Sequence, residues 1–391
     1  MIAKVLYIEG CDFERFPAGG TLNFALQMLK VFGNRLALVG ISTDETPVGR
    51  WVRKNLNGVE YDFFAVRHRD KMADKPLIPS RLSDYIQFSR HKKNIMSLGI
   101  RDAFVREQEV LLAVCNWGWN NVCYFFPGTA NPLRISRYRY SWLLSWLFER
   151  MFFRAVTSTD VILAAADDES IREMICRSRG LLTEERITPF PTHVDTSVFY
   201  PVQRRAARNF LGLPHEKQII VTSGRIHWAK GWDLLTKAFK LFINKNGNSL
   251  FYFIGDGEDR PRLLDYVKSE GLSDCVRVTG YQTPENVSKY LNAADLFVMG
   301  SLSEGWPTAM VEALACGKPM VSTKVSGASS IITQNVNGLV VDDRNPRKFA
   351  QAMADALELK DAAGHNARET EKYALKNLKQ NLEKAWPVLN Q

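Results

Sequence analysis

The chain lacks several sequence patterns that mark common classes of enzyme and binding protein. It has no Asp-x-Asp, no Cys-x-x-Cys and no complete Gly-x-Gly-x-x-Gly. These absences argue, in turn, against a paired-aspartate metal site, against a thiol redox or zinc site, and against the dinucleotide site of a dehydrogenase. No apolar run reaches the roughly 20 residues that a transmembrane helix needs.

Cysteine is scarce, and the few thiols are scattered. Most of them lie in apolar stretches, so we expect reduced thiols in the core of a cytoplasmic protein. The six residues are Cys11, Cys115, Cys123, Cys176, Cys275 and Cys316. Residues 1–9 read as a first strand rather than a signal peptide, because they contain no long apolar region and no cleavage site.

Positive charge is in modest excess and is spread along the chain. The formal net charge is +9. There is no zinc-ligand pattern, helix-turn-helix signal or basic tail to accompany it, so we expect no nucleic-acid partner. A mildly basic surface fits anionic small ligands or the anionic face of a membrane.

Strand-like apolar runs alternate with helical stretches in both halves, which is typical of parallel α/β sheets. The expected strands are 5–9, 36–39, 61–66, 111–114, 122–126 and 161–165 in the first half, and 219–223, 249–254, 276–280, 296–299, 320–322 and 338–341 in the second. A length of 391 residues suits two domains. We place the joint at 188–201, which holds three prolines and few helix formers. Residues 371–386 read as one amphipathic helix.

The most informative segment is 303–319. Glu304 stands on a Gly/Pro turn between an expected strand and a short apolar helix, and Glu312 follows on that helix. Pro307 suits the first helical turn, and Gly317 suits a left-handed stop. Ligands bind open α/β sheets at such loops, where helix N–H groups point toward the carboxyl ends of parallel strands. Two carboxylates there suit sugar hydroxyls; the ordinary alternative is a helix cap followed by an exposed glutamate.

A second Gly-rich segment, 222–232, also joins an expected strand to a helix. Its glycines let the backbone turn sharply and approach a ligand. Arg225 and Lys230 then project into the same strand-end region as Glu304, where two cations can neutralise a diphosphate. An isolated Gly-Arg would be read as a solvated surface cation, but the glutamates downstream favour the phosphate interpretation.

Together the two segments resemble the Glu-x7-Glu and Gly-Arg…Lys-Gly motifs of retaining glycosyltransferases with the GT-B fold, most closely glycosyltransferase family 4. The resemblance is strongest over about 215–345. It implies two Rossmann-like, doubly wound parallel-sheet α/β domains with a cleft between them. Residues 1–195, completed by a crossing helix at about 371–391, would bind the acceptor. Residues 202–370 would bind the nucleotide-sugar.

The resemblance also implies a role for each site residue. As the catalytic residues, Arg225 and Lys230 would stabilise the leaving diphosphate and Glu304 would orient the transferred sugar. Donor-binding positions would be Gly19, Gly20, Gly224, Gly255, Tyr281, Gly305, Trp306, Pro307, Thr308 and Glu312, the last of them on the ribose. Gly19 and Gly20 could equally form an ordinary turn at a helix start. Neither a metal nor a cofactor is expected, since the nucleotide-sugar is a substrate.

Two stretches depart from the family pattern. Many members carry a histidine after a strand of the first domain, whereas the corresponding stretch here, 124–129, has none. We interpret His68, His91 and His193 as surface or structural residues. In the joint, Thr192 and His193 replace the usual Asn-Gly. A front-face mechanism does not strictly require an enzyme base, because the departing phosphate oxygen can take the acceptor proton.

Residues 133–154 combine five arginines and one glutamate with interleaved Trp, Tyr and Phe. A helix of this composition can lie in a membrane interface. The alternative, which the composition favours slightly, is a two-sided core helix that lines the acceptor site. The basic stretch 81–93 could be a mobile loop that contacts the acceptor or a membrane, although a solvated face is the commoner explanation for such a stretch.

The sequence therefore predicts a metal-independent retaining hexosyltransferase that uses a front-face mechanism. Its donor would be UDP- or GDP-linked, and its acceptor a saccharide or lipid-linked saccharide. By family analogy the setting is polysaccharide biosynthesis in the cytoplasm or at the inner face of the membrane. Two rivals stay open, namely a non-catalytic nucleotide-sugar-binding subunit and a GT-B sugar-nucleotide isomerase.

Overall fold

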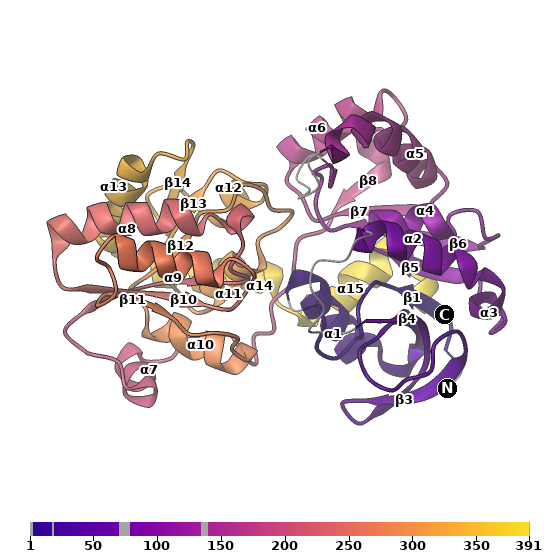
Figure 1. Cartoon of the computed structure of the whole chain (residues 1–391), viewed down its shortest axis with the longest axis horizontal. Helices are drawn as coiled ribbons and strands as arrows, with labels where there is room; N and C mark the ends of the chain where they lie inside the picture. The colour runs from indigo at the N-terminus through magenta and orange to yellow at the C-terminus, as the bar shows by residue number, and fades with distance from the viewer. Residues whose placement is uncertain (1–2, 18, 70–78, 134–139, 391) are drawn as a thin grey trace. The chain divides into compact units, whose positions relative to one another are not determined.

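The computed structural model describes residues 3–17, 19–69, 79–133 and 140–390 of the chain (Figure 1). It divides into two compact units. The N-terminal unit comprises Met1–Pro191 and Leu378–Gln391, and the C-terminal unit comprises Thr192–Asn377. The predicted domain limits were 195, 202 and 370, so the chain returns to the first unit a few residues later than the sequence indicated.

An eight-stranded sheet forms the centre of the N-terminal unit. Its order is β3-β4-β2-β1-β5-β6-β7-β8, and all neighbours are parallel except β3 and β4. The strands are β1 (Val5–Ile8), β2 (Leu36–Ser42), β3 (Trp51–Leu56), β4 (Val59–His68), β5 (Asp102–Val105), β6 (Asn121–Phe126), β7 (Val161–Ala164) and β8 (Ile187–Pro189).

Helices cover both faces of this sheet, and they are α1 (Gly20–Phe32), α2 (Ser80–Arg90), α3 (Lys92–Met96), α4 (Gln108–Val114), α5 (Ser145–Thr157), α6 (Asp168–Ser178) and most of α15 (Lys376–Ala385). On one face, Phe24 of α1 lies 4.9 Å from the ring of Phe125. On the other face, Phe152 of α5 lies 5.5 Å from Phe126. Successive strand residues point to opposite faces, so each face has its own apolar core.

A six-stranded, fully parallel sheet forms the centre of the C-terminal unit, in the order β11-β10-β9-β12-β13-β14. The strands are β9 (Gln218–Ser223), β10 (Ser249–Ile254), β11 (Val276–Val278), β12 (Leu296–Met299), β13 (Met320–Thr323) and β14 (Gly338–Val341). The strand order reverses between β9 and β12. In a doubly wound sheet this reversal marks the edge where ligands bind.

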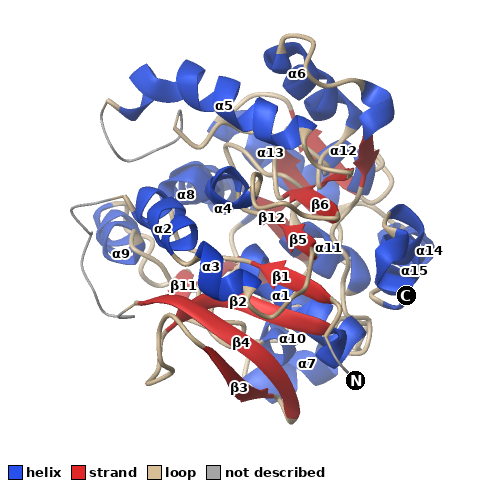
Figure 2. Ribbon diagram, turned by 90° about the vertical axis from the view of Figure 1, so that its right-hand side faces the viewer, coloured by secondary structure: helices blue, strands red, loops and turns tan. Residues whose placement is uncertain are grey.

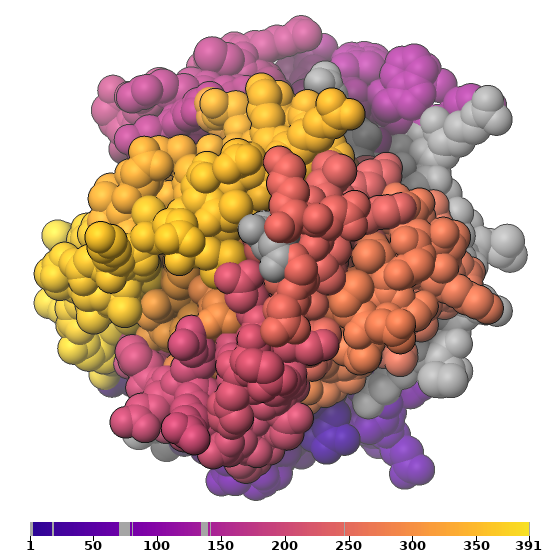
Figure 3. All heavy atoms as spheres, turned by 90° about the vertical axis from the view of Figure 1, so that its left-hand side faces the viewer, coloured from indigo at the N-terminus to yellow at the C-terminus, as the bar shows by residue number. Residues whose placement is uncertain are grey.

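The helices of the C-terminal unit are α7 (Arg204–Leu211), α8 (Trp232–Asn246), α9 (Arg260–Ser269), α10 (Pro284–Ala293), α11 (Thr308–Ala315), α12 (Ala328–Ile331), α13 (Pro346–Leu357) and α14 (Ala362–Tyr373). They bury two apolar cores, one on each face of the sheet. Helices α8 and α13 pack on each other, and Figure 3 shows their segments side by side on one surface of the molecule.

The fold class expected from the sequence is confirmed, but two local predictions were wrong. Residues 111–114 are the end of helix α4, and the neighbouring strand is β5. Helix α4 is buried almost all round, so its short apolar run carries no helical period. The predicted helix 371–386 is two helices, because Ala374 is extended and pairs with Val194 in a parallel bridge.

Two smaller expectations are also decided by the structure. His193 is completely buried, so it is not a surface residue, and burial lowers the pKa of its imidazole to about 4. The six cysteines form no disulfide, and Cys176 on α6 is exposed rather than in the core. In the described part of the chain, no helix is both long and apolar enough to cross a membrane.

Candidate functional site

The candidate site lies at the carboxyl edge of the C-terminal sheet, where β9 and β12 are neighbours. The loop after β9 and the loop after β12 touch there, since Leu302 N–H donates to the Ala229 carbonyl at 2.8 Å. Gly231 has φ of 70°, and a Cβ on it would lie 1.8 Å from the Gly300 carbonyl oxygen. Only glycine fits at this position, and its lack of a side chain lets the backbones of the two loops come into contact.

Lys230 and Glu304 come together across these two loops. The Lys230 ammonium lies 2.5 Å from Glu304 Oε1. The same oxygen accepts from Ser301 Oγ at 2.6 Å, and the Ser301 carbonyl accepts from Thr323 Oγ1 at 2.7 Å. The Lys230 side chain is 44% exposed and that of Glu304 13%. The lysine is therefore accessible to a ligand, while the carboxylate is mostly buried and is positioned by its hydrogen bond from Ser301.

Arg225 lines the same pocket as Lys230, together with Trp232 and Ser223. The pocket is open to solvent and has an empty volume of about 280 Å³. Arg225 is exposed. In the described part of the chain, Ser223 Oγ and Trp232 Nε1 are buried and have no hydrogen-bond partner. The pocket thus offers two cations, which suit an anionic ligand.

The predicted glycines shape the wall of this pocket. Gly255 has φ of 147°, and a Cβ on it would lie 2.0 Å from the Gly224 carbonyl oxygen. Gly224 N–H in turn donates to the Ile254 carbonyl at 3.0 Å. Gly255 also forms an isolated bridge with Gly280, which places the exposed Tyr281 beside the same loop.

The turn before α11 differs by one residue from the prediction. Helix α11 begins at Thr308, so Pro307 occupies the cap position rather than the first turn. Gly305 and Trp306 are partly buried in the turn. Trp306 Nε1 is buried and, among the described residues, has no partner. Gly317 ends the helical segment with φ of 72°, as expected for a left-handed stop.

Glu312 lies one turn into α11 and is only partly accessible. Within the described part of the chain its carboxyl forms no hydrogen bond or ion pair. Burial raises its pKa from 4.5 to about 8. Without a ligand, this carboxyl therefore holds its proton at neutral pH.

Replacing Glu312 by glutamine should flatten the pH dependence of stability. As pH rises from about 4.5 to about 8, the unfolded chain loses the Glu312 proton while the folded chain keeps it, so the free energy of unfolding falls. Glu312→Gln should match the wild type near pH 5 and melt a few degrees higher near pH 9, because about 1 kcal/mol moves Tm by about 2–4 °C. Melting curves across this range test it, with the exposed Glu216→Gln as control. A constant offset at all pH values would contradict it.

Arg344 is a site residue that the sequence analysis missed. It follows β14, and its guanidinium donates to the Gly300 carbonyl and lies 3.5 Å from Asp233 Oδ1. It therefore supports the contact between the two loops from a third strand. Its place after an expected strand was the available signal, but no local pattern indicates that it reaches across β13.

The N-terminal unit has a second group of charges at the carboxyl edge of its sheet, between β1 and β5. Glu9 is buried and accepts from Tyr7 OH at 2.7 Å, with Arg106 at 3.4 Å. Gly10 N–H donates to Glu107 Oε2 at 3.0 Å. Burial raises the pKa of Glu9 and Glu107, although Arg106 opposes the rise at Glu9. This group was not predicted from the sequence, because β5 was not predicted.

Two other predicted features lie in the N-terminal unit. Gly19 caps α1 and Gly20 begins it, both exposed. Arg106 donates to the Thr21 carbonyl at 3.2 Å, which links the start of α1 to the buried charges. A role of this turn toward the donor remains a prediction. Among the described residues, no group of three or more His, Cys, Asp or Glu is placed to hold a metal ion.

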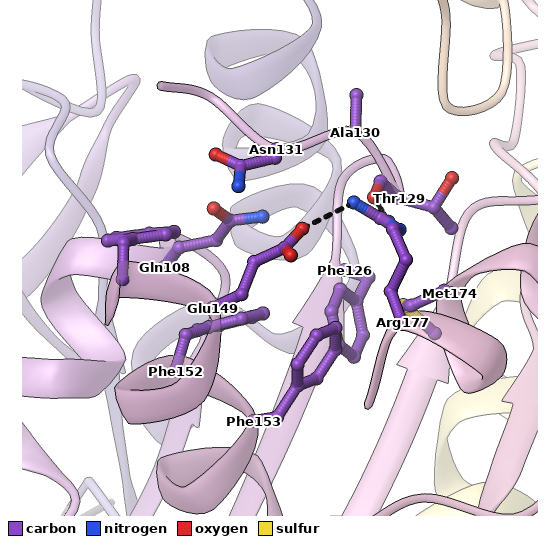
Figure 4. Close-up of a pocket in the computed structure, with 11 residues that line it drawn as sticks. Gln108, Phe126, Thr129, Ala130, Asn131, Glu149, Phe152, Phe153, Met174 and Arg177 are labelled. Carbon is purple, nitrogen blue, oxygen red and sulfur yellow. Dashed lines mark hydrogen bonds and ion pairs between the residues drawn. The ribbon is translucent and has the colours of Figure 1, made fainter. Parts of the chain in front are cut away.

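A second pocket, of about 200 Å³, lies under α5 in the N-terminal unit (Figure 4). Its walls include Phe126, Phe152 and Phe153. Glu149 and Arg177 close it with an ion pair of 2.8 Å. Its two charged lining residues are paired with each other, so the pocket has the character of a packing gap beneath a helix.

Comparison with known proteins finds a family match for the C-terminal unit. Residues 203–377 match the family model of glycosyl transferases group 1. D-inositol 3-phosphate glycosyltransferase from Nocardiopsis dassonvillei is 30% identical over 204 residues, 50% of this chain and 47% of that protein. Amylovoran biosynthesis glycosyltransferase AmsK from Erwinia amylovora is 32% identical over 149 residues, 37% and 36% of the two chains. The matches thus span half or less of these relatives.

Solved structures extend the similarity of fold to the whole chain. Sucrose-phosphate synthase from Thermosynechococcus elongatus superimposes with a TM-score of 0.81 at 16% identity, over 99% of both chains. HepE from Anabaena, solved with UDP and glucose, gives 0.76 at 14% identity over 98% and 99%. Residues 203–377 therefore belong to the glycosyl transferases group 1 family, within a chain that has the GT-B fold.

Proposed function

We propose that this protein is a retaining glycosyltransferase of the family 4 type. It would move a hexose from a UDP- or GDP-linked donor to a saccharide or lipid-linked saccharide. The observation that carries the proposal is the contact of Lys230 with Glu304, beside Arg225, at the carboxyl edge of β9 and β12. The names of the relatives support the transfer of sugar, and the UDP-glucose complex of the HepE structure supports a uridine donor.

Each side chain of the site then has one task. Arg225 and Lys230 neutralise the diphosphate, which becomes more negative as the bond to the sugar breaks. Glu304 accepts hydrogen bonds from sugar hydroxyls through Oε2, while Ser301 holds Oε1. Lys230 is accessible enough to contact both the carboxylate and a phosphate. Glu312 accepts from the ribose, which suits a carboxyl that has no partner among the described residues.

Chemical transfer on one face of the sugar needs no further catalytic group. The bond from the anomeric carbon to the diphosphate oxygen breaks, and an acceptor hydroxyl attacks from the same face. Its proton passes to the departing phosphate oxygen, so the configuration is retained and charge is balanced. The family's histidine is absent from the loop after β6, and this mechanism does not use it.

The acceptor belongs to the N-terminal unit in this proposal. Its supporting feature is the charged edge at Glu9, Arg106 and Glu107, which lies at the strand-order reversal of that sheet. Buried charges at such an edge are typical of binding sites, because their desolvation is offset only by specific partners. A setting in the cytoplasm, or at the inner face of the membrane, is consistent with a nucleotide-sugar donor.

Thermal-shift measurements against UDP, GDP and a panel of their sugars test the donor side. A ligand at 100 times its Kd stabilises the folded protein by about 2.7 kcal/mol. We expect one nucleoside diphosphate and its sugars to raise Tm by several degrees, and Arg225→Ala to remove most of that shift. If none of them raised Tm, the proposed donor site would be wrong.

Chelation should leave transfer unchanged. The phosphate charge in this proposal is handled by Arg225, Lys230 and helix N-termini, so no metal ion takes part. Turnover measured with and without excess EDTA is expected to agree within error. Activity that disappeared with EDTA and returned with Mn²⁺ or Mg²⁺ would contradict this mechanism.

A further inference from the structure

Large apolar side chains are exposed along one segment of the N-terminal unit. Seven of them lie between residues 140 and 151, each 40–64% exposed: Tyr140, Trp142, Leu143, Leu144, Trp146, Leu147 and Met151. Tyr140 caps a short 3-10 helix, Ser141–Leu144, and the other six belong to that helix and to the first half of α5. Single exposed apolar residues are ordinary, but a contiguous run of this size marks an interaction surface.

The exposed residues of α5 lie along one face of the helix. Trp146, Leu147, Arg150, Met151 and Arg154 are exposed at helical spacing. The opposite face carries the Phe residues that pack on the sheet. The helix is therefore apolar on both sides, and packing within this unit covers only the inner one.

Helix α2 presents the same kind of face. Leu82, Tyr85 and Ile86 are exposed, with Arg81 and Arg90 at either end. Helices α2 and α5 both pack on α4, and Figure 2 shows them on either side of it. All three helices contribute to the core on the same side of the sheet. The exposed residues of α2, α5 and the 3-10 helix 141–144 are called the α2–α5 surface below.

In helices α2 and α5 the acidic side chains are largely buried and the basic side chains are exposed. Each acidic side chain turns inward and is paired, Glu149 with Arg177 at 2.8 Å (Figure 4) and Asp84 with Arg67 at 2.6 Å. The exposed charges are all arginines: Arg90, Arg150 and Arg154, and also Arg81, which is paired with the largely buried Glu109 of α4 at 3.0 Å. The α2–α5 surface thus combines Trp, Tyr and aliphatic side chains with positive charge and carries no exposed carboxylate from α2 or α5.

We propose that the α2–α5 surface docks on an anionic lipid bilayer. Trp and Tyr favour the interface between headgroups and acyl chains, and a face of this kind sinks about 5–10 Å into that region. The exposed arginines complement anionic headgroups. A second copy of the chain fits less well, because a two-fold interface would set arginine against arginine without a carboxylate to separate them.

This inference deepens the proposed function, since a lipid-linked acceptor would be met at that same bilayer. It does not depend on the transferase activity, because lipid binding is measured without donor or acceptor. Loss of vesicle binding would leave the donor site untouched. Conversely, a failure to bind nucleotides would not affect the lipid test.

The test is flotation of the full-length protein with vesicles of phosphatidylcholine, with or without about one third phosphatidylglycerol. We expect binding to the anionic vesicles, at least about tenfold weaker binding to phosphatidylcholine alone, and loss in high salt. Trp142→Glu with Trp146→Glu should reduce binding at least about tenfold. Arg150→Glu with Arg154→Glu should remove the preference for phosphatidylglycerol.

The matched control is Phe210→Glu on α7, since Phe210 is 67% exposed in the other unit. It should bind vesicles as the wild type does. The replaced residues are exposed, so melting temperatures should stay within a few degrees for all variants. The proposal is overturned if the wild type does not float with anionic vesicles, or if the tryptophan variant binds equally well. It is also overturned if the wild type is a dimer in sedimentation that the tryptophan variant converts to a monomer.

Discussion

Replacing Lys230 by alanine is expected to lower turnover about 100- to 1000-fold, the loss typical when a donor to developing negative charge is removed. The Lys230 ammonium lies 2.5 Å from Glu304 and faces the pocket that Arg225 also lines. Arg225→Ala should cause a loss of similar size, because in the proposed mechanism both cations act on the same diphosphate. Steady-state rates with a donor and acceptor found by screening give the measurement.

The fold should survive both changes. Arg225 is exposed, and Lys230 is nearly half exposed, so melting temperatures should fall by no more than a few degrees. Lys268→Ala, on the exposed side of α9, provides the control and should turn over at the wild-type rate. Near wild-type rates in both test variants would refute the assignment of a phosphate site.

Glutamine at Glu304 and at Glu312 is expected to give two different defects. Glu304 lies on the turn before α11, in contact with Lys230 and Ser301, where the proposed function puts the transferred sugar. Glu304→Gln should therefore lower turnover strongly and change affinity for the free nucleoside diphosphate little. Glu312→Gln should weaken that affinity about 10- to 100-fold, since a hydrogen bond to a charged group contributes about 1.5–3 kcal/mol.

The raised pKa of Glu312 adds a pH signature to this difference. Its carboxyl becomes a full acceptor only when ionised, and its pKa without ligand is about 8. Affinity of the wild type for the diphosphate should thus rise between about pH 6 and pH 9, or binding should release a proton, whereas Glu312→Gln should show neither effect. Calorimetry in buffers of different ionisation enthalpy measures both. Equal losses of affinity in the two variants would show that the two glutamates do not have separate roles.

Much of the C-terminal unit could be predicted because its signals are local. The strands at 296–299 and 320–322 are short apolar runs bounded by Gly and Pro, and the turn between them carries its own cap and stop. The meeting of Lys230 and Glu304 followed from one rule, that carboxyl ends of parallel strands share an edge. A contact across 74 residues was in this case predictable without any long-range information.

Other features depend on packing that the sequence does not show. Helix α4 is buried nearly all round, so its four apolar residues at 111–114 read equally well as a strand. The error hid β5, and with it Arg106 and Glu107 at the charged edge of the N-terminal unit. The break of the last helix at Ala374 depends on its pairing with Val194, which no local pattern indicates. Arg344 reaches Gly300 across a strand that separates them in the sheet.

The amphipathic segment 133–154 is another case in which composition alone does not decide the structure. Composition indicated both a membrane face and a core helix, and the described part of this segment is both at once. Phe152 and Phe153 face the core, while Trp146 and Met151 are exposed. Only the three-dimensional position of α5, at the edge of its unit beside α4, decides which side is left uncovered.

The most direct test of the central claim is release of nucleoside diphosphate from a panel of UDP- and GDP-sugars by the purified protein, without acceptor. A glycosyltransferase with this site should hydrolyse one donor slowly, because water can replace the acceptor. The account predicts such release from the wild type, none from Lys230→Ala, and the same low rate with EDTA. If the wild type bound a nucleotide-sugar but released no diphosphate from any donor, with or without candidate acceptors, the chain would be a binding subunit and the account would be wrong.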